Sequence, residues 1–141
     1  MKNFLSERVA FYGLLLILSL IVGFHLLVMI GIIPFAIVWG GRLQNHSQML
    51  QFETVSILLN LIMLAVVAVK GGILKVNVKP IILKVALWLM AALFALNTIG
   101  NLFSNNELEK LIFTPLTFLL ALFCFRLAMS KSNNLNSAIS G

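Results

Sequence analysis

Residues 42–60, RLQNHSQMLQFETVSILLN, decide how the rest of this sequence is interpreted. If this stretch forms a helix, its most polar side chains fall within an arc of about 80°, flanked by apolar side chains. The residues on this arc are Arg42, His46, Glu53, Ser56 and Asn60. A solvated amphipathic helix keeps its charges opposite its apolar face. Here the two coincide, and the chain becomes apolar enough to enter a bilayer after Phe52. We therefore expect the polar stripe to face other helices in a membrane.

The composition of the whole chain is that of an integral membrane protein. Of its 141 residues, 61% are hydrophobic and 10% are charged, and the mean hydropathy is +1.08. Soluble domains are about 45–50% apolar. The net charge of +6 does not indicate nucleic-acid binding, because the basic residues lie at the ends of apolar runs. The single cysteine, Cys124, excludes an internal disulfide.

Four apolar runs, at residues 9–33, 52–69, 81–103 and 107–129, are long enough to cross a bilayer. Ser104 and Glu107 have the spacing of a capping box ahead of the fourth run. The connections after the second and third runs are short, which makes neighbouring helices antiparallel. We predict an all-α, four-helix up-down-up-down transmembrane bundle in one domain, residues 1–131. An outward-facing amphipathic segment joins the first two helices, and the polar tail, residues 132–141, is predicted to be disordered.

Small side chains repeat along one face of the fourth run and predict a packing seam there. They are Thr114, Thr117, Ala121, Cys124 and Ala128. The phenylalanines of this run, including Phe123, lie mostly off the seam. We expect them to contact lipid.

The distribution of lysine and arginine predicts the orientation of the chain. Eight of these residues belong to one side of the predicted bundle and only two, Arg42 and Lys110, belong to the other. Because positive residues stay on the cytoplasmic side, both termini are predicted to be cytoplasmic. The polar stripe then lies in the outer half of the membrane.

The candidate site consists of polar residues from the second and third runs and the segment before them. Ionisable groups in a membrane segment are costly and are functional-site hypotheses by default. We predict ligand binding by Arg42, His46, Glu53, Asn60, Asn97 and Asn101. The alternative is structural: Glu53 pairs with Arg42 or His46 and only fixes the first loop, while the asparagines form hydrogen bonds between helices.

The two histidines, His25 and His46, are the candidates for ligating a metal or haem. They lack the spacing of a metal motif, so no metal or other cofactor is predicted. No sequence signature of catalysis is present either, which favours a non-enzymatic protein.

Three segments carry a resemblance to known sequences: VWGGRL at 38–43, HSQMLQFE at 46–53 and GNLFSNNELEKLIFTPLT at 100–117. They resemble a group of small uncharacterised bacterial four-span membrane proteins. The resemblance implies a bacterial inner membrane and brings no activity with it. The general layout is also similar to that of DoxX-like proteins, although no specific motif supports that assignment.

The leading functional hypothesis is a membrane protein that binds or passes a small molecule or ion at the polar site in its outer half. One alternative is a structural or accessory subunit of a membrane complex, whose polar stripe meets a partner protein. Another is a membrane oxidoreductase that uses haem or quinone with His25 and His46. Besides the lipid bilayer, the partners considered are a small-molecule or ion ligand and a second copy of the chain.

Overall fold

The computed structural model describes residues 5–131. It contains four long helices, α1 (Glu7–Met29), α2 (His46–Lys70), α3 (Pro80–Leu102) and α4 (Glu107–Ala128), and no strand in the described part. All four are long and apolar enough to cross a membrane. The predicted all-α membrane fold is therefore confirmed, with helix bounds close to the apolar runs. The tail predicted to be disordered lies outside the described residues.

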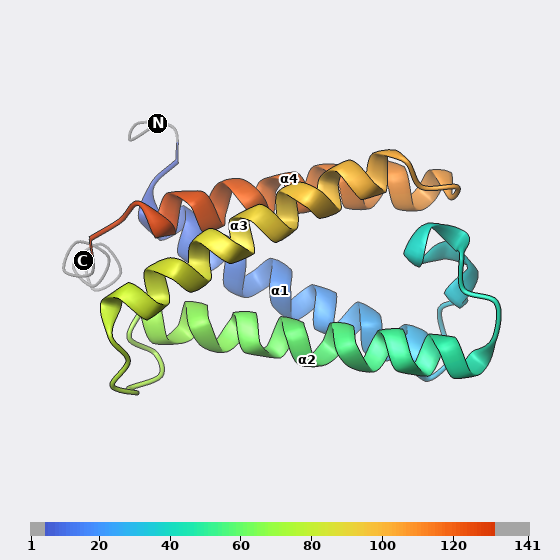
Figure 1. The fold of residues 1–141 in the computed structure, drawn as a ribbon, viewed down its shortest axis with the longest axis horizontal. Coiled ribbons are helices and arrows are strands. Elements are labelled where there is room, and N and C mark those ends of the chain that lie inside the picture. The colour runs from blue at the N-terminus through green and yellow to red at the C-terminus, as the bar shows by residue number, and fades with distance from the viewer. Residues whose placement is uncertain (1–4, 132–141) are drawn as a thin grey trace.

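Consecutive long helices run in opposite directions in Figure 1. Contacts between their ends agree with this. Arg126, near the end of α4, lies 3.4 Å from the Glu7 carboxylate at the start of α1, and its Nε donates to the Leu5 carbonyl at 2.8 Å. Lys70, at the end of α2, donates to the carbonyl of Ser130 just beyond α4. The start of α1 and the ends of α2 and α4 thus lie together.

The four helices do not pack equally on one another. α3 packs along α4, and α1 packs on both α2 and α4, whereas α2 and α3 have few contacts. The main core accordingly centres on α1 and α4, where Phe11, Leu14 and Leu120 are fully buried. The open flank between α2 and α3 is the feature that positions the site.

The seam of α4 is buried as expected at Thr117, Cys124 and Ala128. The expectation that Phe123 contacts lipid is wrong, because its side chain is only 8% exposed. Its ring packs where Gly13 of α1 has no side chain. A Cβ atom at Gly13 would lie 2.5 Å from Phe123 Cε2.

Helix starts follow from their capping residues. The Asn45 side chain accepts a hydrogen bond from Gln48 N at 2.9 Å, so α2 begins at His46 and excludes Arg42. At α4 the cap is Asn106, which accepts from Glu109 N, and the prediction of a cap at Ser104 is wrong. The Ser104 hydroxyl instead donates to the Glu109 carboxylate at 2.5 Å.

Two short 3-10 helices, η1 (Phe35–Ile37) and η2 (Trp39–Gly41), form the segment between α1 and α2. This segment folds over the helix ends, where Val28, Val38 and Met49 form a second buried cluster. This cluster holds the segment that carries Trp39 against the start of α2. The amphipathic segment predicted between the first two helices continues into α2, which begins at His46.

Candidate functional site

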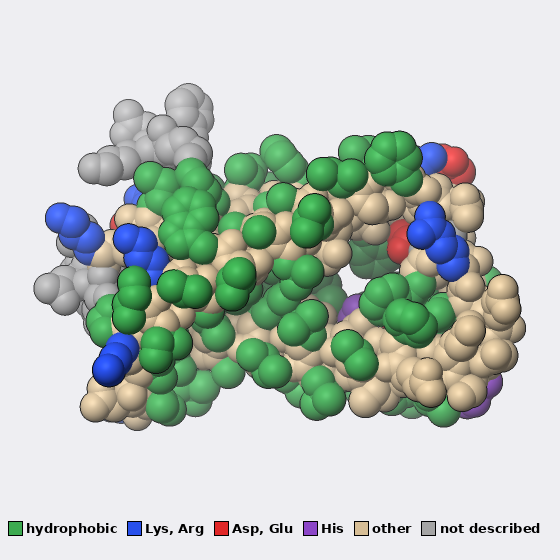
Figure 2. Space-filling model, in the orientation of Figure 1, with side chains coloured by type: hydrophobic (Ala, Val, Ile, Leu, Met, Phe, Trp, Pro, Cys, Tyr) green, Lys and Arg blue, Asp and Glu red, His purple; other side chains and the backbone are tan. Residues whose placement is uncertain are grey.

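A cavity of about 450 Å³ lies between α2 and α3, at the end of the bundle opposite Lys70 and Arg126. The space-filling view shows a hollow between the helices, with histidine and acidic side chains visible inside it (Figure 2). The polar lining comes from all four long helices and the α1–α2 segment. Its main members are His25, Arg42, Asn60, Asn97, Asn101 and Glu109. Ligand pockets typically measure about 300–1,000 Å³, so this volume suits a small molecule.

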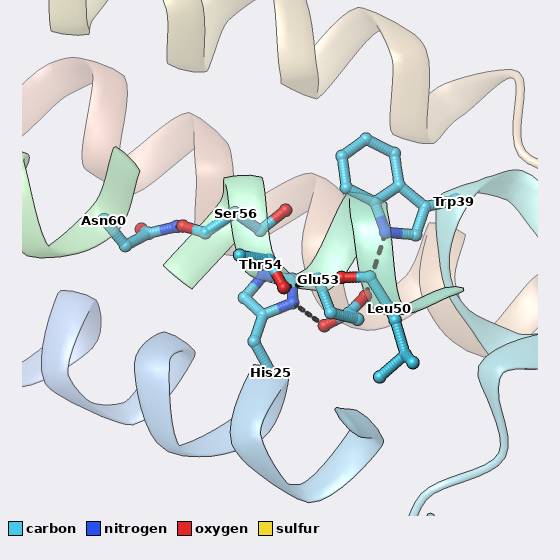
Figure 3. Close-up of polar contacts among 7 residues, drawn as sticks. All are labelled: His25, Trp39, Leu50, Glu53, Thr54, Ser56 and Asn60. Atoms are coloured by element: carbon cyan, nitrogen blue, oxygen red, sulfur yellow. Dashed lines mark hydrogen bonds and ion pairs between the residues drawn. The ribbon is translucent and has the colours of Figure 1, made fainter. Parts of the chain in front are cut away.

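Glu53 lies directly behind this lining and is completely buried. Its carboxylate accepts a hydrogen bond from Trp39 Nε1 at 2.9 Å and bonds His25 Nδ1 at 2.5 Å. Figure 3 shows Glu53 between His25, which comes from α1, and Trp39, which comes from the connecting segment. Both partners line the cavity, whereas Glu53 does not. Glu53 therefore acts on the cavity through the two side chains that it holds.

Trp39 adopts a backbone conformation that L residues rarely occupy, with a φ of 55°. The left-handed region costs a non-glycine residue about 1–2 kcal/mol. Two contacts of the side chain offset this cost. The centroid of its ring lies 4.9 Å from that of Phe52, and its N–H donates a hydrogen bond to Glu53. Such strain is concentrated at functional sites in proteins, and here it places the indole at the cavity.

The pairing of Glu53 with Arg42 or His46, considered above as the structural alternative, does not form, because the partners of Glu53 are His25 and Trp39. The physical reason is the cap at Asn45. Since α2 starts only after Asn45, Arg42 lies outside the helix and does not share its inner face. Arg42 still reaches the cavity lining, whereas His46 is exposed and does not line it.

The three predicted asparagines all line the cavity but differ in their contacts. The Asn60 amide donates to the Ser56 carbonyl of its own helix at 2.8 Å. Asn101 reaches across from α3 to the Thr117 hydroxyl of α4 at 3.4 Å. The Asn97 side chain makes no hydrogen bond within the described part of the chain. Of the three, Asn97 is therefore the most available to a ligand.

The structure does not bring His25 and His46 together. His25 lies in the cavity, and His46 is exposed at the start of α2. Histidine appears at two separate places in Figure 2. Among residues 5–131, no group of three or more histidine, cysteine or acidic residues could hold a metal ion.

Three residues at the site, Trp39, Glu109 and His25, are not among the ligand-binding residues that the sequence predicts. One signal could have paired His25 with Glu53: each is the only Lys, Arg, His, Asp or Glu within its apolar run, residues 9–33 and 52–69, and the end of the first run leads to the start of the second. Nothing comparable marks Trp39, because its position depends on the fold of η1 and η2.

Comparisons with protein-family models, curated proteins and solved structures find no match to this chain. The site is therefore interpreted from its own geometry.

Proposed function

We propose that this small integral membrane protein is non-enzymatic and binds or passes a small molecule or ion in the cavity between α2 and α3. The observation that carries this proposal is a polar cavity of about 450 Å³ placed between helices that cross the membrane. Polar side chains in membrane helices are costly and usually mark ligand or ion pathways. Here Asn60, Asn97 and Asn101 come from two different helices and line one space.

Within this proposal the lining residues have different tasks. Arg42 supplies a positive charge at the cavity and attracts an anionic group. Asn97 and Asn101 donate hydrogen bonds from α3. Glu53 is a positioning residue, because it bonds His25 and Trp39 without lining the cavity. His46 has no task in this site, since it is exposed and lies outside the lining.

The proposal includes a location. We infer a bacterial inner membrane from the resemblance to the small four-span bacterial proteins, and we place both termini in the cytoplasm from the lysine and arginine distribution. The cavity then opens in the outer half of the bilayer. Membership of that four-span group is itself part of the proposal.

A cavity-filling substitution tests the function. Gly100 lines the cavity, and a Cβ atom there would meet nothing within 4 Å. Gly100→Leu should therefore occupy part of the cavity without a clash against the protein. Gly23→Leu is the matched control, because Gly23 is also helical and unobstructed but lies outside the lining.

The measurement is native mass spectrometry of the protein released from its own membrane. We expect a bound mass on the wild type and on Gly23→Leu, and its loss from Gly100→Leu. A bound mass retained equally by all three, or absent from the wild type, would contradict binding in this cavity.

A further inference from the structure

A second cavity lies in the same groove between α2 and α3. Its volume is about 230 Å³, and every side chain that lines it is apolar. It shares Leu59, Met63 and Leu93 with the polar cavity. The two spaces are therefore consecutive parts of one groove, and the second part continues away from the polar end along Val66 and Ala86.

The groove has a polar end and an apolar end separated along the membrane normal. Ala86 in the apolar part and Asn97 in the polar part are eleven residues apart on α3, which is about 16 Å along a helix axis. A water-soluble ligand would gain nothing from the apolar part. A molecule with a polar head and a long apolar chain would fill both.

The charges of the polar end indicate the kind of head that fits. Its two carboxylates already have donors, because His25 and Trp39 bond Glu53 and the Ser104 hydroxyl bonds Glu109. Arg42 forms no ion pair within the described residues. Arg42 is therefore the one charged side chain of the lining that has no polar partner among the described residues, and guanidinium groups bind phosphate through two parallel hydrogen bonds.

The groove is also accessible from the bilayer. α2 and α3 pack mainly on their other neighbours and have few contacts with each other. Leu59 of α2 and Leu96 of α3, which both line the polar cavity, are 41% and 65% exposed. A lipid chain can enter sideways between these helices without breaking the main core, which lies around α1 and α4.

We propose that the ligand of this groove is a membrane phospholipid with a net negative head. Its phosphate lies at Arg42 and Asn97, and one of its chains runs along the apolar part past Ala86. This inference rests on the proposed function, since it names the ligand class of the same cavity.

The test uses the purified, delipidated full-length protein in detergent, titrated with defined probes and followed by native mass spectrometry. The probes are phosphatidylglycerol, phosphatidylcholine with the same two oleoyl chains, and glycerol 3-phosphate, which has a phosphate head and no chain. Phosphatidylglycerol should be retained about tenfold better than phosphatidylcholine, because the choline cation of phosphatidylcholine offsets the charge of the phosphate that Arg42 binds. Glycerol 3-phosphate should not be retained.

Two variants test the binding of the lipid head and the binding of the lipid chain separately. Arg42→Gln should remove the preference for phosphatidylglycerol, and its control is Lys110→Gln, because Lys110 pairs with Glu107 and does not line the cavity. Ala86→Phe should lower retention of both lipids by filling the apolar part. Its control is Ala95→Phe, since Ala95 lies on the exposed side of α3 and outside both linings.

Three outcomes would overturn the proposal in distinguishable ways. Equal retention of both lipids by every variant would mean that lipid binds non-specifically to the apolar outer surface of the helices and not in the groove. Glycerol 3-phosphate bound as well as phosphatidylglycerol, with Ala86→Phe silent, would replace the phospholipid by a soluble phosphate compound and leave the cavity function intact. A bound mass that Gly100→Leu removes but that differs from any phospholipid would also leave the function intact and overturn this ligand.

Discussion

At the residue scale, the decisive feature is a buried carboxylate with two donors. Glu53 accepts from Trp39 Nε1 and bonds His25 Nδ1, so His25 uses Nδ1 for this contact and keeps Nε2 free of it. A carboxylate accepts hydrogen bonds only, which makes Nδ1 the donor. An ionised Glu53 therefore orients a histidine that lines the cavity and holds its proton on Nδ1.

Two substitutions of Glu53 should differ in their effect on stability. Gln can keep both contacts, because its carbonyl accepts from Trp39 and its amide can donate to the other tautomer of His25. Leu leaves both donors without an acceptor, and because both are only partly buried the total cost should lie below the roughly 1–3 kcal/mol that each would cost if fully buried. We expect Glu53→Gln to melt near the wild type in detergent and Glu53→Leu to melt several degrees lower.

Thr54→Val is the control for this comparison, because Thr54 is exposed on the same helix and bonds only the Leu50 carbonyl. Equal melting temperatures for Glu53→Leu and Thr54→Val would show that the Glu53 contacts contribute nothing to stability.

At the element scale, the sequence predicts the helices well because their signals are local. Pro80 begins α3 at the first-turn position that proline favours, and the buried face of α2 through Glu53, Ser56 and Asn60 follows from its spacing. The position of Phe123 was missed for a different reason. A large aromatic ring is buried there only because α1 presents Gly13 opposite it, and single-helix periodicity contains no information about the opposite helix.

This contact gives a prediction for the α1–α4 packing. Gly13→Ala introduces a Cβ atom 2.5 Å from Phe123 Cε2, and overpacking of this kind typically costs about 1–3 kcal/mol. The protein should therefore melt at a lower temperature in detergent. Adding Phe123→Leu should recover part of the loss, because contacting residues are coupled by about 0.5–3 kcal/mol.

Gly23→Ala is the matched control on the same helix, since a Cβ atom there would meet nothing within 4 Å. Alanine also favours a helix over glycine by about 1 kcal/mol, so this variant should be neutral or more stable. If Gly13→Ala behaved in the same way, α1 and α4 would not approach as closely as the structure places them.

At the scale of the whole molecule, the cavity depends on how unequally the helices pack on one another, which no local sequence pattern predicts. The sequence identifies Arg42, Asn60, Asn97 and Asn101 as site residues, and all four line one cavity. It does not reveal that α2 and α3 separate while α3 packs on α4. Because of this difference in packing, the site is a groove open to the bilayer. The difference itself depends on how the side chains of all four helices fit together.

The orientation of the bundle in the membrane decides which leaflet the groove faces. Eight lysine and arginine residues on one side against two on the other predict that the loop at Lys75 and the segment after α4 at Lys131 are cytoplasmic and that Asn105 is outside. Alkaline phosphatase, which is active only outside the inner membrane, should therefore be active when fused at Asn105 and inactive when fused at Lys75 or Lys131. Green fluorescent protein fusions should give the opposite pattern. Active phosphatase at Lys75 would reverse the bundle, and the groove would then receive its ligand from the cytoplasmic leaflet instead of the outer one.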